Sequence, residues 1–162
     1  MKTTAPATAP RPAPAAVTTL AELSSRTGLD VLAHLEREAA VPVVGGPQAQ
    51  GDLIVVPHEL VADAEVPADA EWRPVPPGGV ELLRGAGGHP HTLTADAGAC
   101  RWTAGVGDPQ GLALGLAEVS GVAYLLHPEH GGTGIAPGRY LIRRQREHAV
   151  RAVGAGNQLI AD

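Results

Sequence analysis

Residues 51–57 read G-D-L-I-V-V-P, and this stretch indicates best how the chain folds. A Gly-Asp turn opens a run of four apolar residues, Leu53 to Val56, and Pro57 ends the run. A short apolar run bounded by turn residues is typical of a buried β-strand. We therefore expect a strand that begins directly after the turn at Gly51.

The same pattern of short apolar runs between turn residues recurs along the rest of the chain. Gly (21) and Pro (15) are both abundant, which suits many short strands better than long helices. Further strands are expected at 80–84, 89–94, 100–103 and 139–147, and one or two more across 112–126 around Ser120-Gly121. Residues 127–138 are expected to form a loop. The sequence thus predicts a mainly β fold, a small antiparallel barrel or sandwich.

The segments on either side of this β region have a different composition. Residues 1–16 are rich in Pro and Ala and predict a disordered arm. Residues 17–41 predict a helical segment with a capping box from Thr19 to Glu22, and Gly28 leaves open one long helix or two short ones. The β domain is expected over 51–150 and a C-terminal tail over 151–162.

Composition narrows the classes of protein that fit. Hydrophobic residues make up 44% of the chain and Phe is absent, so one core of Val, Leu, Ile and Ala is expected. The net charge of -5 does not favour a nucleic-acid binder. Cys100 is the only cysteine, which excludes an internal disulfide framework and predicts a buried, inert thiol. The sequence has neither a secretion signal nor a membrane-length apolar run, so a cytoplasmic location is expected by default.

Four of the seven histidines form two close pairs at the ends of expected strands. His89-Pro90-His91 places two imidazoles on one face of an extended strand. His127-Pro128-Glu129-His130 adds two imidazoles and a carboxylate. Imidazole is the commonest metal ligand, so the four histidines predict a site for Zn²⁺, Mn²⁺ or Fe²⁺, with Glu129 as the nearest general base.

A plainer interpretation of these histidines stays open. They are then solvated loop residues, or core residues bonded to backbone carbonyls. His34, His58 and His148 are expected to be ordinary surface residues, and His58 is the reserve candidate for a further ligand.

The last expected strand carries the one concentrated positive patch of the sequence. After the turn Ala136-Pro137-Gly138, the chain reads R-Y-L-I-R-R-Q-R-E over residues 139–147. Arg143, Arg144 and Arg146 are candidates to bind a phosphate or carboxylate. Alternatively, they form a solvated strand end that pairs with Glu147.

Taken together, these motifs resemble a family of small uncharacterised bacterial and phage proteins. The motifs are G-D-L-I-V-V-P, P-V-P-P-G-G-V-E-L-L-R-G, G-H-P-H, H-P-E-H and A-P-G-R-Y-L-I-R-R-Q-R-E, and they span about residues 51 to 147. The resemblance implies one β domain and a shared role for its histidines and arginines. It implies no reaction.

The function expected from the sequence is a metal-dependent histidine site that binds or acts on a small anionic or phosphate-bearing ligand. The alternative is an interaction module or assembly subunit that docks on a protein partner, or on a second copy of itself, through the N-terminal arm and helix. A third alternative is nucleotide or RNA handling through the arginines. Whether the protein is an enzyme stays open.

Overall fold

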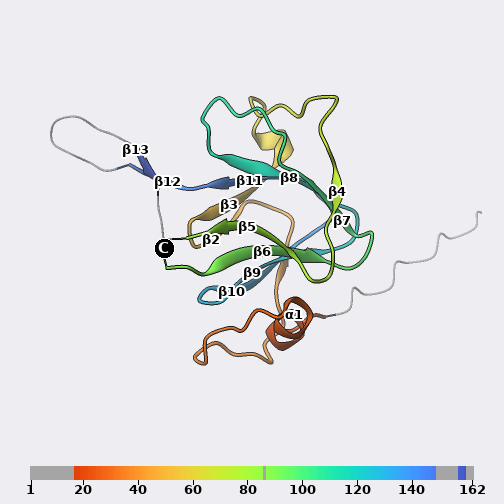
Figure 1. Cartoon of the computed structure of the whole chain (residues 1–162), viewed down its shortest axis with the longest axis vertical. Coiled ribbons are helices and arrows are strands. Elements are labelled where there is room, and N and C mark those ends of the chain that lie inside the picture. The colour runs from red at the N-terminus through yellow and green to blue at the C-terminus, as the bar shows by residue number, and fades with distance from the viewer. Residues whose placement is uncertain (1–16, 86, 149–156, 160–162) are drawn as a thin grey trace, which may run out of the picture.

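The computed structural model describes residues 17–85, 87–148 and 157–159, and the expected arm at 1–16 lies outside them. Strands dominate, with one short α-helix and one 3-10 helix (Figure 1). The elements are α1 (Leu20–Thr27), β1 (Val43–Val44), β2 (Gln48–Gln50), β3 (Leu53–Pro57), η1 (His58–Leu60), β4 (Arg73–Pro74), β5 (Val80–Arg84), β6 (Pro90–Ala95), β7 (Cys100–Thr103), β8 (Ala113–Val119), β9 (Ala123–His127), β10 (Gly131–Ile135), β11 (Gly138–Arg144), β12 (Arg146–His148) and β13 (Asn157–Leu159).

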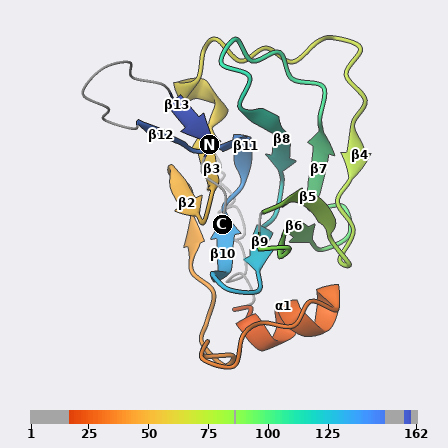
Figure 2. The ribbon, with the colours of Figure 1, turned by 60° about the vertical axis from the view of Figure 1, so that its left-hand side comes forward.

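The strands form two main sheets that face each other. One sheet has the order β1-β10-β9-β6-β5 and the other has the order β2-β3-β11-β8-β7-β4, while β12 pairs with β13 apart from both. The pairs are antiparallel except for β1 with β10. Both sheets have open edges, so the fold is sandwich-like and the barrel alternative is wrong (Figures 1 and 2).

The main core lies between the two sheets and follows the alternation of each strand. Ala123 and Leu125 of β9 face this core together with Leu53 and Ile142 from the other sheet. Tyr124 and Leu126 face the opposite side and belong to a second cluster. The same alternation directs the next residue of β9, His127, into the space between the sheets.

The N-terminal segment covers the outer face of the first sheet, as Figures 1 and 2 both show for α1. Leu20 and Leu23 are buried there against Tyr124 and Leu126. The expected capping box is confirmed, since Thr19 accepts from the Glu22 N–H and Glu22 accepts from the Thr19 N–H.

The helix is shorter than the sequence suggests. A helical segment was expected over 17–41, but α1 ends at Thr27 because Gly28 takes the left-handed conformation with φ 71° and caps it. The following residues form turns, and the N–H of Leu32 bonds outside the segment, to the Pro128 carbonyl.

Two expectations about strands also need correction. The loop expected over 127–138 contains β10, which pairs with β9 through the tight turn at 128–130. The strand expected over 139–147 is divided, because β11 ends at Arg144 and β12 begins at Arg146. The expected break at Ser120-Gly121 is confirmed, since it separates β8 from β9.

Within the described residues, we find no helix of the length and apolar character that a membrane crossing needs. Cys100 is buried in the main core, and this burial raises the pKa of its thiol to about 12. The thiol therefore stays protonated at neutral pH, which agrees with the inert role expected for it.

Candidate metal centre

His91 and His127 are neighbours on adjacent strands of the first sheet. The pairing of Thr92 with Leu126 in β6 and β9 sets His91 directly beside His127. Both side chains face the inter-sheet space, and both residues are almost fully buried, at 0% and 1% exposure. Their ring centroids lie 4.2 Å apart, so the two imidazoles are in contact at one end of the core.

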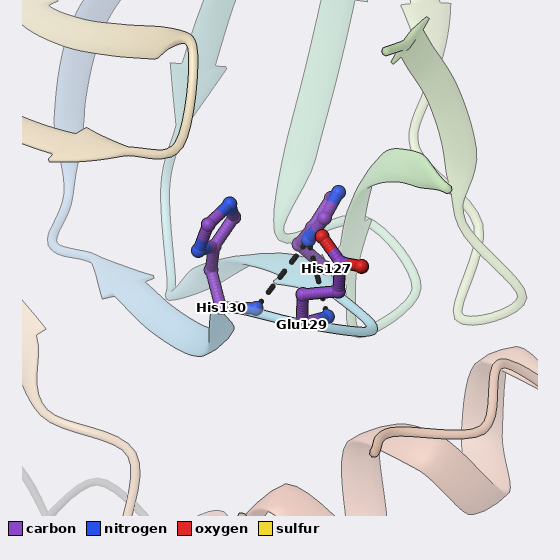
Figure 3. A group of neighbouring side chains, drawn as sticks. All are labelled: His127, Glu129 and His130. Atoms are coloured by element: carbon purple, nitrogen blue, oxygen red, sulfur yellow. Dashed lines mark hydrogen bonds between the residues drawn. The ribbon is translucent and has the colours of Figure 1, made fainter. Parts of the chain in front are cut away.

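The turn between β9 and β10 brings a carboxylate and a third imidazole to the same place (Figure 3). His130 stacks on His127 with ring centroids 4.6 Å apart. One ligand atom from each of His127, Glu129 and His130 lies within 4.8 Å of the other two. These residue types are common ligands of divalent ions, so the group could hold one.

His89 completes the cluster at its rim. It lies two residues before His91, and its ring centroid is 6.1 Å from that of His127. Its Nε2 is 3.5 Å from Oε1 of Glu129, with both side chains 39% exposed. The four histidines named from the sequence therefore lie together, buried on one side and open to solvent at His89, Glu129 and His130.

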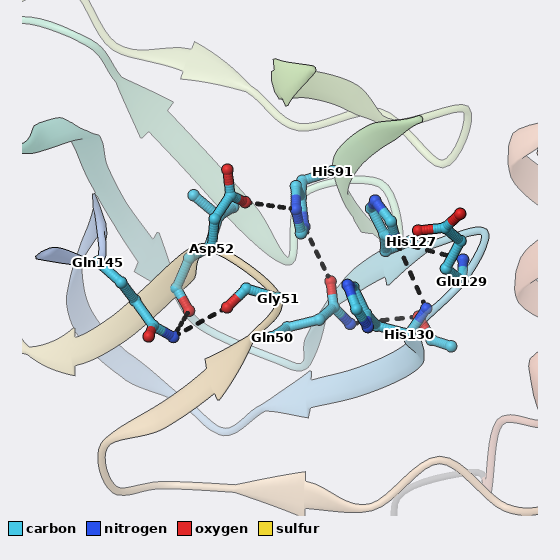
Figure 4. A network of polar contacts seen from close by, with 10 residues as sticks. Gln50, Gly51, Asp52, His91, His127, Glu129, His130 and Gln145 are labelled. Atoms are coloured by element: carbon cyan, nitrogen blue, oxygen red, sulfur yellow. Dashed lines mark hydrogen bonds and ion pairs between the residues drawn. The ribbon is translucent and has the colours of Figure 1, made fainter. Parts of the chain in front are cut away.

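Two buried polar residues that the sequence did not reveal hold His91 in place (Figure 4). Nε2 of His91 lies 2.8 Å from Oδ1 of Asp52, and Nδ1 lies 3.3 Å from Oε1 of Gln50. Nε2 of His91 and Oδ1 of Asp52 are close enough to form an ion pair when His91 is protonated. Asp52 and Gln50 flank Gly51, and the sequence indicates only a turn there.

The amide of Gln50 has a fixed orientation. Its Nε2 donates to the carbonyls of Leu125 and Gly131, so its oxygen must face His91. Both ring nitrogens of His91 thus meet oxygen atoms, and these contacts favour a supporting role for this histidine. Metal ligation by His91 stays a prediction from the sequence.

His127 is oriented by its own turn. Its Nδ1 accepts from the backbone N–H groups of Glu129 at 3.2 Å and His130 at 3.4 Å. These contacts are long for N–H···N hydrogen bonds and therefore weak. They place the lone pair of a neutral His127 on Nδ1, inside the turn that also carries Glu129 and His130.

The three candidate arginines do not form one patch. The alternation of β11 sets Arg144 on the face of Tyr140 and Ile142, which are core residues, and Arg143 on the opposite face with Leu141. The guanidinium of Arg146 lies outside both faces and donates to the Gln110 carbonyl.

Arg143 has an acidic neighbour, Asp108. Burial alone would raise the pKa of Asp108, but backbone hydrogen bonds from Gln110, Leu112 and Ala113, together with the charge of Arg143, hold this pKa below its ordinary value. The positive charge of Arg143, on the outer face of its sheet, therefore interacts with the negative charge of Asp108.

The remaining histidines lie elsewhere. Nε2 of His58 is bonded to the Ala64 carbonyl at 2.8 Å, which ties this reserve candidate to its own loop. His34 is exposed in the N-terminal segment, and His148 belongs to β12.

The fold and the cluster define a two-sheet β protein with a histidine-rich, partly buried polar centre at one end of its core. Residues 49–145 match the model of a family described as a domain of unknown function, DUF8820, and the chain belongs to that family. No curated protein and no solved structure matches the chain. The matched region contains Gln50, Asp52 and all four clustered histidines, whereas α1 lies outside it.

Proposed function

We propose that this domain binds a divalent transition metal ion through His127, Glu129 and His130. The observation that carries the proposal is the convergence of one ligand atom from each residue within 4.8 Å. Two imidazoles and a carboxylate are a ligand set suited to Zn²⁺, Mn²⁺ or Fe²⁺. Because the set has three members, a position on the ion stays open for another group.

His89 is the protein residue best placed for that open position, since it lies beside Glu129 at the rim. An ion with three or four protein ligands at a partly exposed rim polarises a bound oxygen and lowers the pKa of a bound water. In this arrangement Glu129 serves as a ligand, so the general-base role expected from the sequence falls to another group.

Metal binding is coupled to the turn at His127. If the ion binds Nδ1, it replaces the contacts with the N–H groups of Glu129 and His130. If the ion binds Nε2, the proton of the neutral ring moves to Nδ1, which then repels the same N–H groups. In both cases the turn must adjust, so the amide NMR signals of Glu129 and His130 are expected to shift on metal addition.

The test is a titration of metal-free protein with Zn²⁺ by calorimetry, and with Co²⁺ by visible absorption. We expect one ion per chain, and a loss of affinity of about tenfold or more in Glu129→Gln and in His130→Ala. His34→Ala is the matched control, because His34 is exposed outside the cluster. Equal metal affinity in all variants, or no stoichiometric binding, would overturn the proposal.

The alternative, an interaction module that docks through its helix, has less support. The apolar residues of α1, Leu20 and Leu23, are already buried against the protein's own sheet. Docking through α1 would require the helix to leave that position. If metal binding fails, the interaction module becomes the better hypothesis, and the search for a partner starts from surfaces other than the buried side of α1.

A further inference from the structure

Among the three candidate arginines, Arg144 is the one on the inner face of a main sheet. It pairs with Leu53 of β3, and Leu53 pairs with Gln50 of β2. Directly paired residues lie on the same face of a sheet, so Gln50, Leu53 and Arg144 form one row across three strands. Neighbouring strands are about 4.8 Å apart, which sets Arg144 roughly two strand spacings from Gln50.

That row faces the histidine cluster. The side chain of Gln50 contacts His91, and the ring of His91 contacts His127. Arg144 therefore lies in the same row as Gln50, the residue that joins this sheet to the histidine cluster.

The guanidinium of Arg144 also has unused hydrogen-bonding capacity. Its Nε is buried and has no hydrogen-bond partner, although a buried donor without an acceptor costs about 1–3 kcal/mol. One nitrogen of Arg143, Nη1, is buried in the same way, but the charge of Arg143 is matched by Asp108. Within the described part of the chain, no ion pair involves Arg144.

We propose that Arg144 binds a small oxyanion at the mouth of the sandwich, with the oxyanion also occupying the open position of the metal ion. This proposal rests on the metal site proposed above. A guanidinium forms two parallel hydrogen bonds to carboxylate or phosphate oxygens, and the metal supplies the second positive contact. The ligand class is a small carboxylate or phosphate compound that reaches both groups at once.

The experiment uses full-length protein loaded with Co²⁺ and titrated with inorganic phosphate or with acetate at constant ionic strength. An oxyanion that enters the coordination sphere changes the Co²⁺ absorption spectrum, and the stronger of the two anions identifies the ligand class. Arg144→Gln is expected to weaken anion binding about tenfold or more. Arg144→Lys keeps the positive charge but cannot form the two parallel hydrogen bonds, so it is expected to weaken anion binding less.

Arg143→Gln is the matched control, because it removes the same charge from the same strand on the opposite face. It is expected to bind the anion as the unmodified protein does. Co²⁺ affinity in anion-free buffer and circular dichroism, measured for each variant, separate loss of the anion site from loss of the metal or the fold.

Four results would overturn the proposal. If Arg144→Gln binds both anions normally, Arg144 has no role in anion binding. If Arg143→Gln and Arg144→Gln lose the same amount of anion affinity, the effect comes from the overall charge of the protein and not from a site at Arg144. If Arg144→Gln unfolds, Arg144→Lys takes its place in the comparison. Normal anion binding by folded Arg144→Lys would then show that the two parallel hydrogen bonds of the guanidinium are not needed. Unmodified protein that binds no Co²⁺ would refute the metal site, and the oxyanion proposal with it.

Discussion

The buried contact between Asp52 and His91 leads to a quantitative prediction for Asp52→Asn, which removes the carboxylate charge and keeps the shape of the side chain. The two side chains are 3% and 0% exposed, and the atoms that meet are 2.8 Å apart. When His91 is protonated, the attraction between the two charges at an effective dielectric constant near 20 is about 6 kcal/mol before the cost of desolvation. Desolvation of two ions offsets most of this attraction, so the net contribution of the intact pair is small.

Asp52→Asn is expected to have a larger effect than the loss of an exposed pair, because it removes a charged acceptor from a buried imidazole, which then loses its proton. The loss of this charge-assisted contact is expected to lower the free energy of unfolding by about 1–3 kcal/mol. The exposed pair Arg37–Asp30 provides the matched control, since its side chains are 44% and 84% exposed at nearly the same distance, 2.9 Å. Asp30→Asn is expected to cost less than about 1 kcal/mol.

The assay is urea denaturation of the metal-free protein, with the midpoint and the slope fitted separately for each variant. An unchanged slope shows that the compactness of the two states is preserved, and the difference in midpoint then gives the loss of stability. If Asp52→Asn and Asp30→Asn lose the same small amount, Asp52 and His91 do not form a buried charge pair, and our account of how His91 is held is wrong.

Three further predictions concern the rest of the fold. Leu23→Ala leaves a cavity between α1 and the first sheet and is expected to lower the free energy of unfolding by about 2–5 kcal/mol, as measured by denaturation. Asp108→Asn is expected to destabilise the protein at neutral pH. Since the folded state lowers the pKa of Asp108, the stabilisation is present above the unfolded pKa and lost as pH falls through the folded one, so the variants should converge in acid. Cys100 should resist alkylation by iodoacetamide at pH 8 in the native state and react once the chain is unfolded, because burial raises its pKa to about 12.

The strands that the sequence revealed are those whose local pattern and tertiary role agree. β3 and β9 are apolar runs between turn residues; β9 is buried along its whole length, and β3 buries alternate residues. β10 reads G-G-T-G-I, which has low strand propensity, and its strand conformation comes from pairing with β9. Its glycines have a steric reason that no local pattern contains. A Cβ at Gly134 would lie 2.8 Å from Cγ2 of Val43, and one at Gly132 would lie 3.1 Å from Cδ1 of Leu23.

The N-terminal segment illustrates how leucine spacing can mislead. Leu29 and Leu35 continue the spacing of Leu20 and Leu23, and all four contact the same apolar cluster. They reach it from turns after Gly28, because a common buried side requires apolar residues at intervals whether or not the backbone is helical. The capping box at Thr19 was the more informative signal, since it depends on local hydrogen bonds alone.

In the candidate site, too, the residues that the sequence revealed are placed by local contacts, and those that it did not reveal are placed by distant contacts. The histidine pairs could be recognised because a strand directs residues two apart to one face and a short turn keeps His127 near His130. Gln50 and Asp52 could not be recognised, since each contacts His91 from about forty positions earlier in the chain. The turn itself is held from the other side by Leu32, whose N–H donates to the Pro128 carbonyl at 2.9 Å. Residues within the family region therefore supply the polar groups of the centre, while a segment outside that region helps to fix the backbone that presents them.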